Sequence, residues 1–242
     1  PGGRGPLDSI GKQQAGEWLT RVEEGLESLP GEAGETPEVE GLRMVFLYLK
    51  GRYLIREGHY ETGTALVEDM LAIASRLGNA GYVIQGYKEL IYHAIRIHDL
   101  GRMAQCIEPA LAEARRRQER KEIGVLLRLK GLMKMLNGSL EEAEELLGQA
   151  LQTFRSIENE NPRYALNIAA CHCYRGDIFR YRGKYDKALK LYRQAIALAK
   201  SAWGTQSLAI FHSGAGQAAY QLGRWEEARD HLEQAIRIYD LL

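Results

Sequence analysis

Glycines recur in this chain at fixed places within segments that otherwise have helical periodicity. The chain has 242 residues and 26 glycines, about 11%, against a usual frequency of about 7%. Glycine in a helix interior costs about 1 kcal/mol relative to alanine, so its repeated use in a helical sequence needs a structural reason. Four segments share one pattern: a first glycine, a second glycine seven residues later, and a small residue five positions after that. These segments begin at Gly51, Gly131, Gly176 and Gly216.

Helix geometry accounts for this spacing. The second glycine of each segment is predicted to end a helix in the left-handed conformation, which glycine adopts at the lowest cost. The first glycine, two turns earlier, lets another helix approach closely, and the small residue beyond the turn makes the facing contact. The pattern therefore predicts antiparallel helix hairpins. The predicted turn glycines are Gly58, Gly138, Gly183 and Gly223.

A fifth, weaker copy of the pattern lies between the first two. We place its turn at Gly101, with Ala94 in the position of the first glycine and Cys106 in that of the small residue. The turn glycines are then separated by 43, 37, 45 and 40 residues. A period near 40 is typical of stacked helical repeats. Pro109 falls inside the second helix of this copy and is expected to kink or shorten it.

The expected organisation is an N-terminal helix followed by five hairpins. Residues 8–29 form the opening helix, residues 30–37 a loop, and residues 38–242 the repeat domain, all of it α-helical. We therefore divide the chain into residues 1–37 and 38–242. The apolar stripe of the opening helix comprises Leu19, Val22, Leu26 and Leu29. The hairpins are predicted at 38–57 with 59–77, 80–100 with 102–118, 120–137 with 139–157, 162–182 with 184–203, and 205–222 with 224–242.

The segments GKYDKALKLYRQAI and GRWEEARDHLEQAI resemble the second-helix motif of the tetratricopeptide repeat. The resemblance extends over about residues 38–242, is weakest in the second hairpin, and has a longer period than the standard repeat of about 34 residues. Long repeats of this kind are similar to those in bacterial signalling regulators and in kinesin-light-chain-type scaffolds. The resemblance implies a right-handed α-solenoid that binds a protein or peptide and is not an enzyme.

Composition argues against several classes of protein. Lys plus Arg and Asp plus Glu both number 32, so no net charge draws the segment to nucleic acid or to an anionic membrane. No apolar run reaches 18 residues, and the first residues contain no signal-like apolar core. Three cysteines do not make a disulfide framework. We therefore expect a cytoplasmic protein that does not bind nucleic acid or membranes directly.

Candidate catalytic and metal-binding motifs are explained more simply by helix packing. Cys171 and Cys173 flank His172, but residues two apart on a helix point about 200° away from each other and cannot converge on one metal. His172 and His212 occupy matching places in the fourth and fifth hairpins, which favours a packing role for both. The sequence has no nucleophile elbow, phosphate loop or dinucleotide fingerprint. We expect no metal, no cofactor and no enzymatic activity.

The expected functional surface is the concave side of the repeat, which the first helix of each hairpin lines. Its positions combine cations, tyrosines and apolar residues. They suit an extended peptide or helix with acidic groups and an apolar anchor. The predicted groove residues are Tyr48, Arg52, Arg56, Lys88, Ile91, Arg128, Leu132, Asp177, Arg180, Tyr181, Gln217 and Tyr220.

Two alternative functions follow from other features. The last helix has an apolar outer face, where either further chain follows, as in a segment of a larger bacterial signalling or transcription-regulatory protein, or two copies join as a homodimer. A small-molecule sensor is the third hypothesis, with a pocket around Ile91, Ile95 and His98. The residues of the outer face are Ala228, Leu232, Ala235, Tyr239 and Leu242.

Overall fold

The structure is a computed structural model that describes residues 6–27, 36–162, 164–201 and 205–241. Every regular element in these ranges is a helix, which confirms the predicted all-α class. The helices form two compact units that divide between Arg117 and Gln118. Most of the predicted loop at 30–37, together with Leu29 and Leu242, lies outside the described residues.

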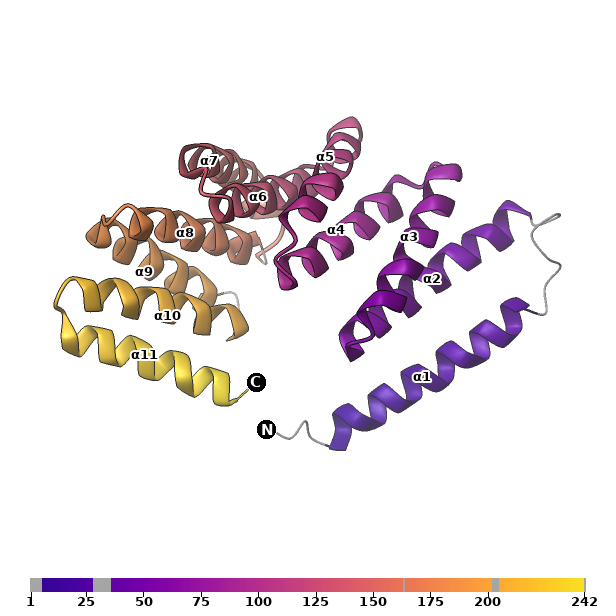
Figure 1. Cartoon of the computed structure of the whole chain (residues 1–242), viewed down its shortest axis with the longest axis horizontal. Helices are drawn as coiled ribbons and strands as arrows, with labels where there is room; N and C mark the ends of the chain where they lie inside the picture. The colour runs from indigo at the N-terminus through magenta and orange to yellow at the C-terminus, as the bar shows by residue number, and fades with distance from the viewer. Residues whose placement is uncertain (1–5, 28–35, 163, 202–204, 242) are drawn as a thin grey trace. The chain divides into compact units, whose positions relative to one another are not determined.

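The first unit contains the opening helix and two hairpins (Figure 1). Its helices are α1 (Pro6–Glu27), α2 (Pro37–Glu57), α3 (Tyr60–Arg76), α4 (Ala80–Arg96) and α5 (Leu100–Arg116). The predicted stripe of α1 is buried where it meets α2: Leu19 and Leu26 pack with Phe46, and Val22 covers the cluster. The opening helix is therefore part of this unit's core.

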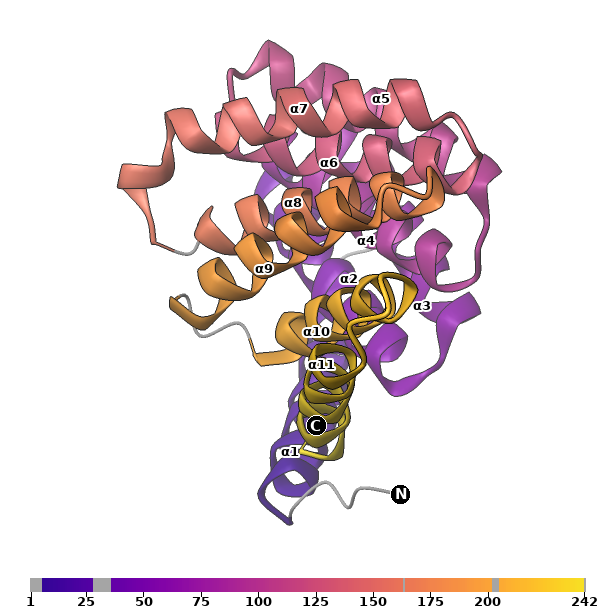
Figure 2. The ribbon, with the colours of Figure 1, turned by 90° about the vertical axis from the view of Figure 1, so that its left-hand side faces the viewer.

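The second unit consists of three hairpins, and neighbouring hairpins pack directly on one another (Figures 1 and 2). Its α-helices are α6 (Arg120–Leu136), α7 (Leu140–Ser156), α8 (Tyr164–Tyr181), α9 (Tyr185–Ser201), α10 (Thr205–Gln221) and α11 (Trp225–Asp240). A short 3₁₀ helix, η2 (Glu158–Glu160), lies between α7 and α8. The five predicted hairpins are thus present, three of them in this unit.

The repeat is more regular than its glycines indicate. Helices α3 to α7 each have 17 residues and begin 20 residues apart. The added residues between α7 and α8, which include η2, shift the later helices by five positions, after which the 20-residue spacing resumes. The structural unit is therefore one helix plus a three-residue connection, used twice in each hairpin. The predicted turn glycines 58, 138, 183 and 223 all have positive φ, as expected.

The predicted register of the second hairpin was wrong by three residues. The left-handed residue at its turn is His98, with φ of 57°, whereas Gly101 lies inside α5. Asp99 caps α5 by accepting a hydrogen bond from the backbone N–H of Arg102 at 2.8 Å. With His98 as the turn, the turn-to-turn spacings become 40, 40, 45 and 40 residues. Ile91 then takes the place of the first glycine, because this hairpin has no glycine there.

Pro109 does not shorten α5, so that part of the prediction was wrong; the predicted alternative, a kink, stays a prediction. The helix has 17 residues with Pro109 in its interior, the same length as its neighbours. Proline removes one N–H and leaves the carbonyl four residues earlier without its helical partner. That carbonyl belongs to Gln105, an exposed residue, so water can satisfy it.

Close approach of the paired helices is direct in the first hairpin. A Cβ atom built on Gly51 would lie 2.9 Å from the carbonyl oxygen of Gly63, and a Cβ on Gly63 would lie 2.8 Å from that of Gly51. Any larger residue at either position would force α2 and α3 apart. The predicted role of the first glycine is confirmed here.

We expect that His98→Gly stabilises the protein by about 0.5–1 kcal/mol, because glycine removes the cost of a left-handed conformation that a side chain makes unfavourable. The reciprocal variant, Gly138→His, places the same side chain at φ of 81° and should destabilise by a similar amount. Urea unfolding followed by circular dichroism measures both. Equal stability of wild type and both variants would contradict this account of the turns.

Candidate ligand-binding face

The first helices of the three hairpins in the second unit, α6, α8 and α10, form one face. A pocket of about 250 Å³ opens between them. It brings together one cation, two polar side chains and several apolar groups, so it offers both hydrogen bonds and an apolar surface to a ligand. Its lining includes Arg128, Asn167, Tyr174, Ser207, Ile210 and Phe211.

The polar groups of this pocket are held by packing within the unit. Arg128 is largely buried, and its guanidinium lies 5.9 Å from the centre of the Tyr174 ring in a cation–π contact. Asn167 lies on the same face of α8 as Tyr174, two helical turns earlier. Ile210 on α10 is half exposed, at 51%, and supplies an apolar contact at the edge of the pocket.

Three predicted groove residues follow Tyr174 toward the end of α8. Asp177 accepts a hydrogen bond from the Tyr192 hydroxyl at 2.6 Å and pairs with Arg180 at 3.2 Å. Arg180 also lies 4.7 Å from the ring centre of Tyr181, which is 55% exposed. Asp177 and Arg180 are therefore committed to contacts within the fold, whereas Tyr181 presents its ring to a ligand.

The remaining predicted residues of this unit differ in exposure. Gln217 and Tyr220 on α10 are exposed, and the Tyr220 ring packs edge-on against Trp225 with centroids 5.1 Å apart. Leu132 on α6 is only 8% exposed, so it contributes to packing more than to an open surface.

In the first unit, the predicted residues lie on α2 and α4. Tyr48 is buried, and its ring packs edge-on against Tyr82. Arg52 lies over the Tyr48 ring and pairs with Glu89 at 2.8 Å. These contacts join α2 to α4, so both side chains serve the structure of the unit.

The other predicted residues of the first unit differ in their exposure to solvent. Arg56 is exposed, and Lys88 is half-buried and donates to Gln85 at 3.3 Å. Ile91 is fully buried, because the corrected register puts it in the interior of the hairpin. It offers no surface for the small-molecule pocket that the sequence predicts around Ile91, Ile95 and His98.

Of the six lining residues named above, the sequence reasoning predicted only Arg128 and missed Asn167, Tyr174, Ser207, Ile210 and Phe211. A signal exists for three of them. Positions 167, 174, 177 and 181 on α8 share a helical stripe, as do 210, 213, 217 and 220 on α10. Extending each predicted stripe toward the start of its helix would have found Asn167, Tyr174 and Ile210.

Comparison with known proteins agrees with this arrangement. The family model described as the tetratricopeptide repeat matches residues 122–201 and, in a second match, residues 167–240. The second unit consists of tetratricopeptide repeats. These matches cover the second unit, and the helix hairpins of the first unit have the same type of fold. No curated protein matches the sequence.

Solved structures with a similar fold cover nearly the whole chain. BtubC from P. vanneervenii aligns with a TM-score of 0.70 at 16% identity, over 94% of this chain and 89% of that one. NprR in complex with its cognate peptide NprX aligns with a TM-score of 0.71 at 16% identity, over 96% of this chain and 62% of that one. The apo form of RapI aligns with a TM-score of 0.65 at 16% identity, over 97% of this chain and 62% of that one. The chain thus spans less than two thirds of NprR and RapI.

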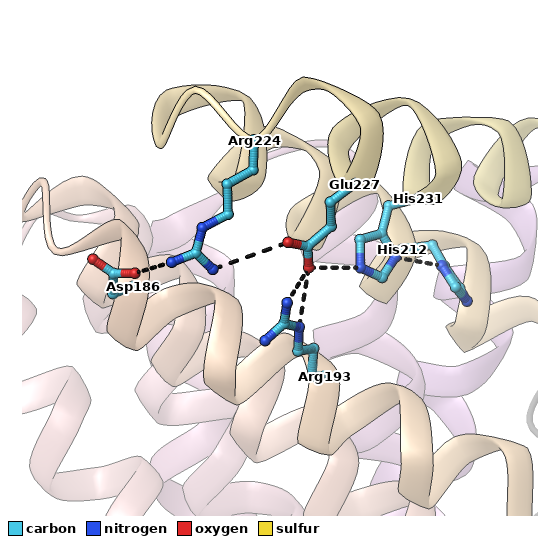
Figure 3. A network of polar contacts seen from close by, with 6 residues as sticks. All are labelled: Asp186, Arg193, His212, Arg224, Glu227 and His231. Carbon is cyan, nitrogen blue, oxygen red and sulfur yellow. Dashed lines mark hydrogen bonds and ion pairs between the residues drawn. The ribbon is translucent and has the colours of Figure 1, made fainter.

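The last two hairpins of the repeat protein are joined by a polar network that spans α9, α10 and α11 (Figure 3). Glu227 lies at its centre, where it accepts a hydrogen bond from Arg193 on α9 at 3.1 Å and faces His231 at 3.7 Å. The Nδ1 atoms of His231 and the buried His212 are 3.0 Å apart, so one ring donates and the other accepts. The network therefore requires at least one neutral imidazole.

In the described ranges, no three His, Cys, Asp or Glu side chains converge to hold a metal ion. Cys171 and Cys173 are buried free thiols; burial raises the pKa of Cys171 to about 12 and also raises that of Cys173. Neither is a thiolate at neutral pH.

No helix in the described part of the chain is long and apolar enough to cross a bilayer.

The histidine pair predicts a loss of stability in acid. Burial, with the nearby His231 and Lys200, lowers the pKa of His212 to about 4, below its ordinary value of 6.5. Between pH 6.5 and 4 the unfolded chain therefore binds a proton that the folded chain does not. The free energy of unfolding should fall by about 1–2 kcal/mol from this histidine between pH 7 and pH 5. His212→Asn should reduce this dependence in urea titrations, and an unchanged dependence would contradict the assignment.

Proposed function

We propose that this protein is a non-catalytic scaffold that binds an extended peptide, or an extended segment of a protein, on the face formed by α6, α8 and α10. The observation that carries the proposal is the pocket in which Arg128, Asn167 and Ile210 come from three different helices. A ligand that crosses the repeat would contact all three. The tetratricopeptide repeat family and the similarity to NprR, which was solved with its cognate peptide, support this class of ligand.

The chemistry of the pocket suits a peptide backbone with side chains of two kinds. The Asn167 amide has both a donor and an acceptor, as a peptide group does, so it can pair with the ligand's main chain. Ile210 and Tyr181 provide apolar area for an anchor side chain. The hairpins are already packed, so the ligand loses most of the conformational freedom on binding.

An acidic group on the ligand is the counterpart of Arg128. Two of the cations predicted for the inner wall, Arg52 and Arg180, are paired with Glu89 and Asp177. The positive charge of this wall is therefore smaller than the sequence predicts. Because Arg128 is the cation that lines the pocket itself, we place the acidic group of the ligand there and not along the whole face.

We further propose that the chain belongs to a larger cytoplasmic protein of bacterial signalling or transcription control. The fit to NprR and RapI over 62% of their lengths supports this, since more than a third of each of those chains lies outside the match. Its three described cysteines are all unpaired and buried, in keeping with a reducing compartment.

Two isoleucines provide a matched test of the binding face. Ile210 on α10 and Ile236 on α11 are both half exposed, at 51% and 58%. Against an array of random peptides of mixed charge, wild type should select a set of sequences that Ile210→Glu no longer binds, because a buried carboxylate would face the ligand's apolar anchor. Ile236→Glu should bind the same set as wild type.

Asn167→Ala should weaken the selected peptides by about tenfold in isothermal calorimetry, equal to the loss of about 1–2 kcal/mol of hydrogen bonding. Selection of the same peptides by wild type, Ile210→Glu and Asn167→Ala would place the binding site elsewhere.

Self-association through α11 is a second candidate function, favoured by one observation. An apolar row on this helix is exposed, although Ala228 and Ala235 of the predicted outer face are buried in the hairpin. An exposed row of this kind is typical of an interface. The exposed residues of this row are Trp225, Leu232, Ile236 and Tyr239.

Sedimentation at increasing protein concentration tests this second function. We expect a dimer that Ile236→Glu converts to a monomer, because the charge would lie in the interface, while Ile210→Glu leaves the dimer intact. A wild-type protein that stays monomeric at all concentrations would exclude self-association through α11. The two glutamate variants thus separate the two candidate functions.

A further inference from the structure

A second pocket of the same unit lies on the other side of α8. It has a volume of about 420 Å³ and is formed by α7, α8 and α9. On α8, His172, Arg175 and Phe179 line it, whereas Asn167 and Tyr174 line the pocket on the peptide-binding side. Asp177 and Tyr181 share the helical stripe of Asn167 and Tyr174. Since Arg175 and Asp177 are two residues apart, they point in nearly opposite directions from the helix axis. The two pockets can therefore be occupied independently.

The charges in this pocket are all of one sign. Arg155 from α7, Arg175 from α8, and Lys187 and Lys190 from α9 line it, and no carboxylate does. We call these four residues and His172 the basic pocket. Among the residues that the structure describes, Glu144 is the acidic group that pairs with this set, at 3.8 Å from Arg175. Four cations gathered within one cavity repel one another unless an anion lies between them.

Two buried nitrogen atoms in the basic pocket have no hydrogen-bond partner among the described residues. They are Nδ1 of His172 and Nε of Arg175. His172 is only 7% exposed, so its ring is well over nine-tenths buried. A buried donor that is left unsatisfied costs free energy, and most such groups in folded proteins have a partner. Both atoms belong to residues that line the cavity, so the two unsatisfied nitrogens lie in its wall.

The imidazole of His172 is uncharged at neutral pH and can act as a hydrogen-bond donor. Burial, followed by the Arg155 and Arg175 charges, lowers the pKa of His172 to about 4. At neutral pH the ring therefore has one N–H, which can donate to an oxygen. An anion in the cavity would oppose the effect of the two arginines, so its binding should raise this pKa.

We propose that the basic pocket binds the phosphate group of a phosphorylated small molecule. Arginine and lysine are the side chains that bind phosphate in proteins, and a dianion matches the surrounding charge better than a single carboxylate does. Phe179 and Leu191 form an apolar wall beside the cations, so the molecule has an apolar or aromatic part next to its phosphate. The volume suits a ligand of this size.

The test uses inorganic phosphate and phenyl phosphate with the whole chain at about 0.15 M salt, where weak surface attraction is screened. We expect both to bind in isothermal calorimetry, and phenyl phosphate to bind about tenfold more tightly because its ring contacts the apolar wall. The ring signals of His172 in NMR should shift on binding, and their titration should move to higher pH.

Exposed members of the pocket provide variants that are expected to fold. Arg155→Gln combined with Lys190→Gln should weaken phenyl phosphate by at least tenfold. Lys200→Gln is the control. Lys200 lies on α9, as Lys190 does, but outside the pocket, so the substitution also removes a positive charge and should leave the affinity for phenyl phosphate unchanged. Circular dichroism establishes that all three proteins are equally helical.

Three outcomes would overturn the proposal. The first is that neither phosphate compound binds wild type. The second is binding that the double variant retains, which would mean general attraction to the surface. The third is a phosphopeptide or an oligonucleotide that displaces phenyl phosphate and binds far more tightly through the same residues, which would assign the pocket to a macromolecule. None of these bears on the peptide-binding face, whose variants lie on the opposite side of α8.

Discussion

The structure depends on helices that come closer together than side chains would allow. The point is clearest at Tyr192 in the second unit. Its ring is fully buried, and Cβ atoms added to Gly176 or Gly214 would lie 3.0 and 2.5 Å from it. One aromatic side chain of α9 thus fills the space that two glycines leave on α8 and α10. It ties its own hairpin to the next, and its hydroxyl donates to Asp177. Alanine at either glycine would displace this ring.

This packing also shapes the candidate binding face. The hydrogen bond from Tyr192 fixes Asp177, and Asp177 in turn holds Arg180 beside the Tyr181 ring. Asp177 and Arg180, which the sequence analysis assigned to ligand binding, therefore position neighbouring side chains of the fold. What is left for a ligand is the exposed Tyr181 ring and the part of the stripe nearer the start of α8, where Asn167 and Tyr174 line the pocket with Arg128. The core contact and the binding face are parts of one arrangement.

The sequence was sufficient for the fold because each unit of structure leaves a local signal. Turn glycines mark the ends of helices, and the helical period marks their buried faces. The exception shows the limit: the second hairpin has His98 at its turn, and using Gly101 as the turn marker gave a register that is three residues off. Asp99, a good capping residue, was the better signal, because a cap must precede its helix.

The candidate sites were harder to predict for a different physical reason. Exposure of a helix position depends on which neighbours cover it, and those neighbours are distant in sequence. Leu132 and Tyr48 occupy plausible groove positions, yet both are largely buried. The basic pocket shows the same limit, since its cations come from three helices and are unremarkable within each one. Only stacking of α7, α8 and α9 makes Arg155, Arg175 and Lys190 neighbours.

The two faces of α8 line two separate pockets, so one helix of this repeat can contribute to two binding sites. The helix is held from one side by Tyr192 and presents different residues to each pocket. A ligand can influence the opposite face only if it favours a different packing of this helix. A fully buried ring against two glycines leaves little room for such a change. We therefore expect the two ligands to bind additively, with the phosphate compound acting on stability more than on peptide affinity.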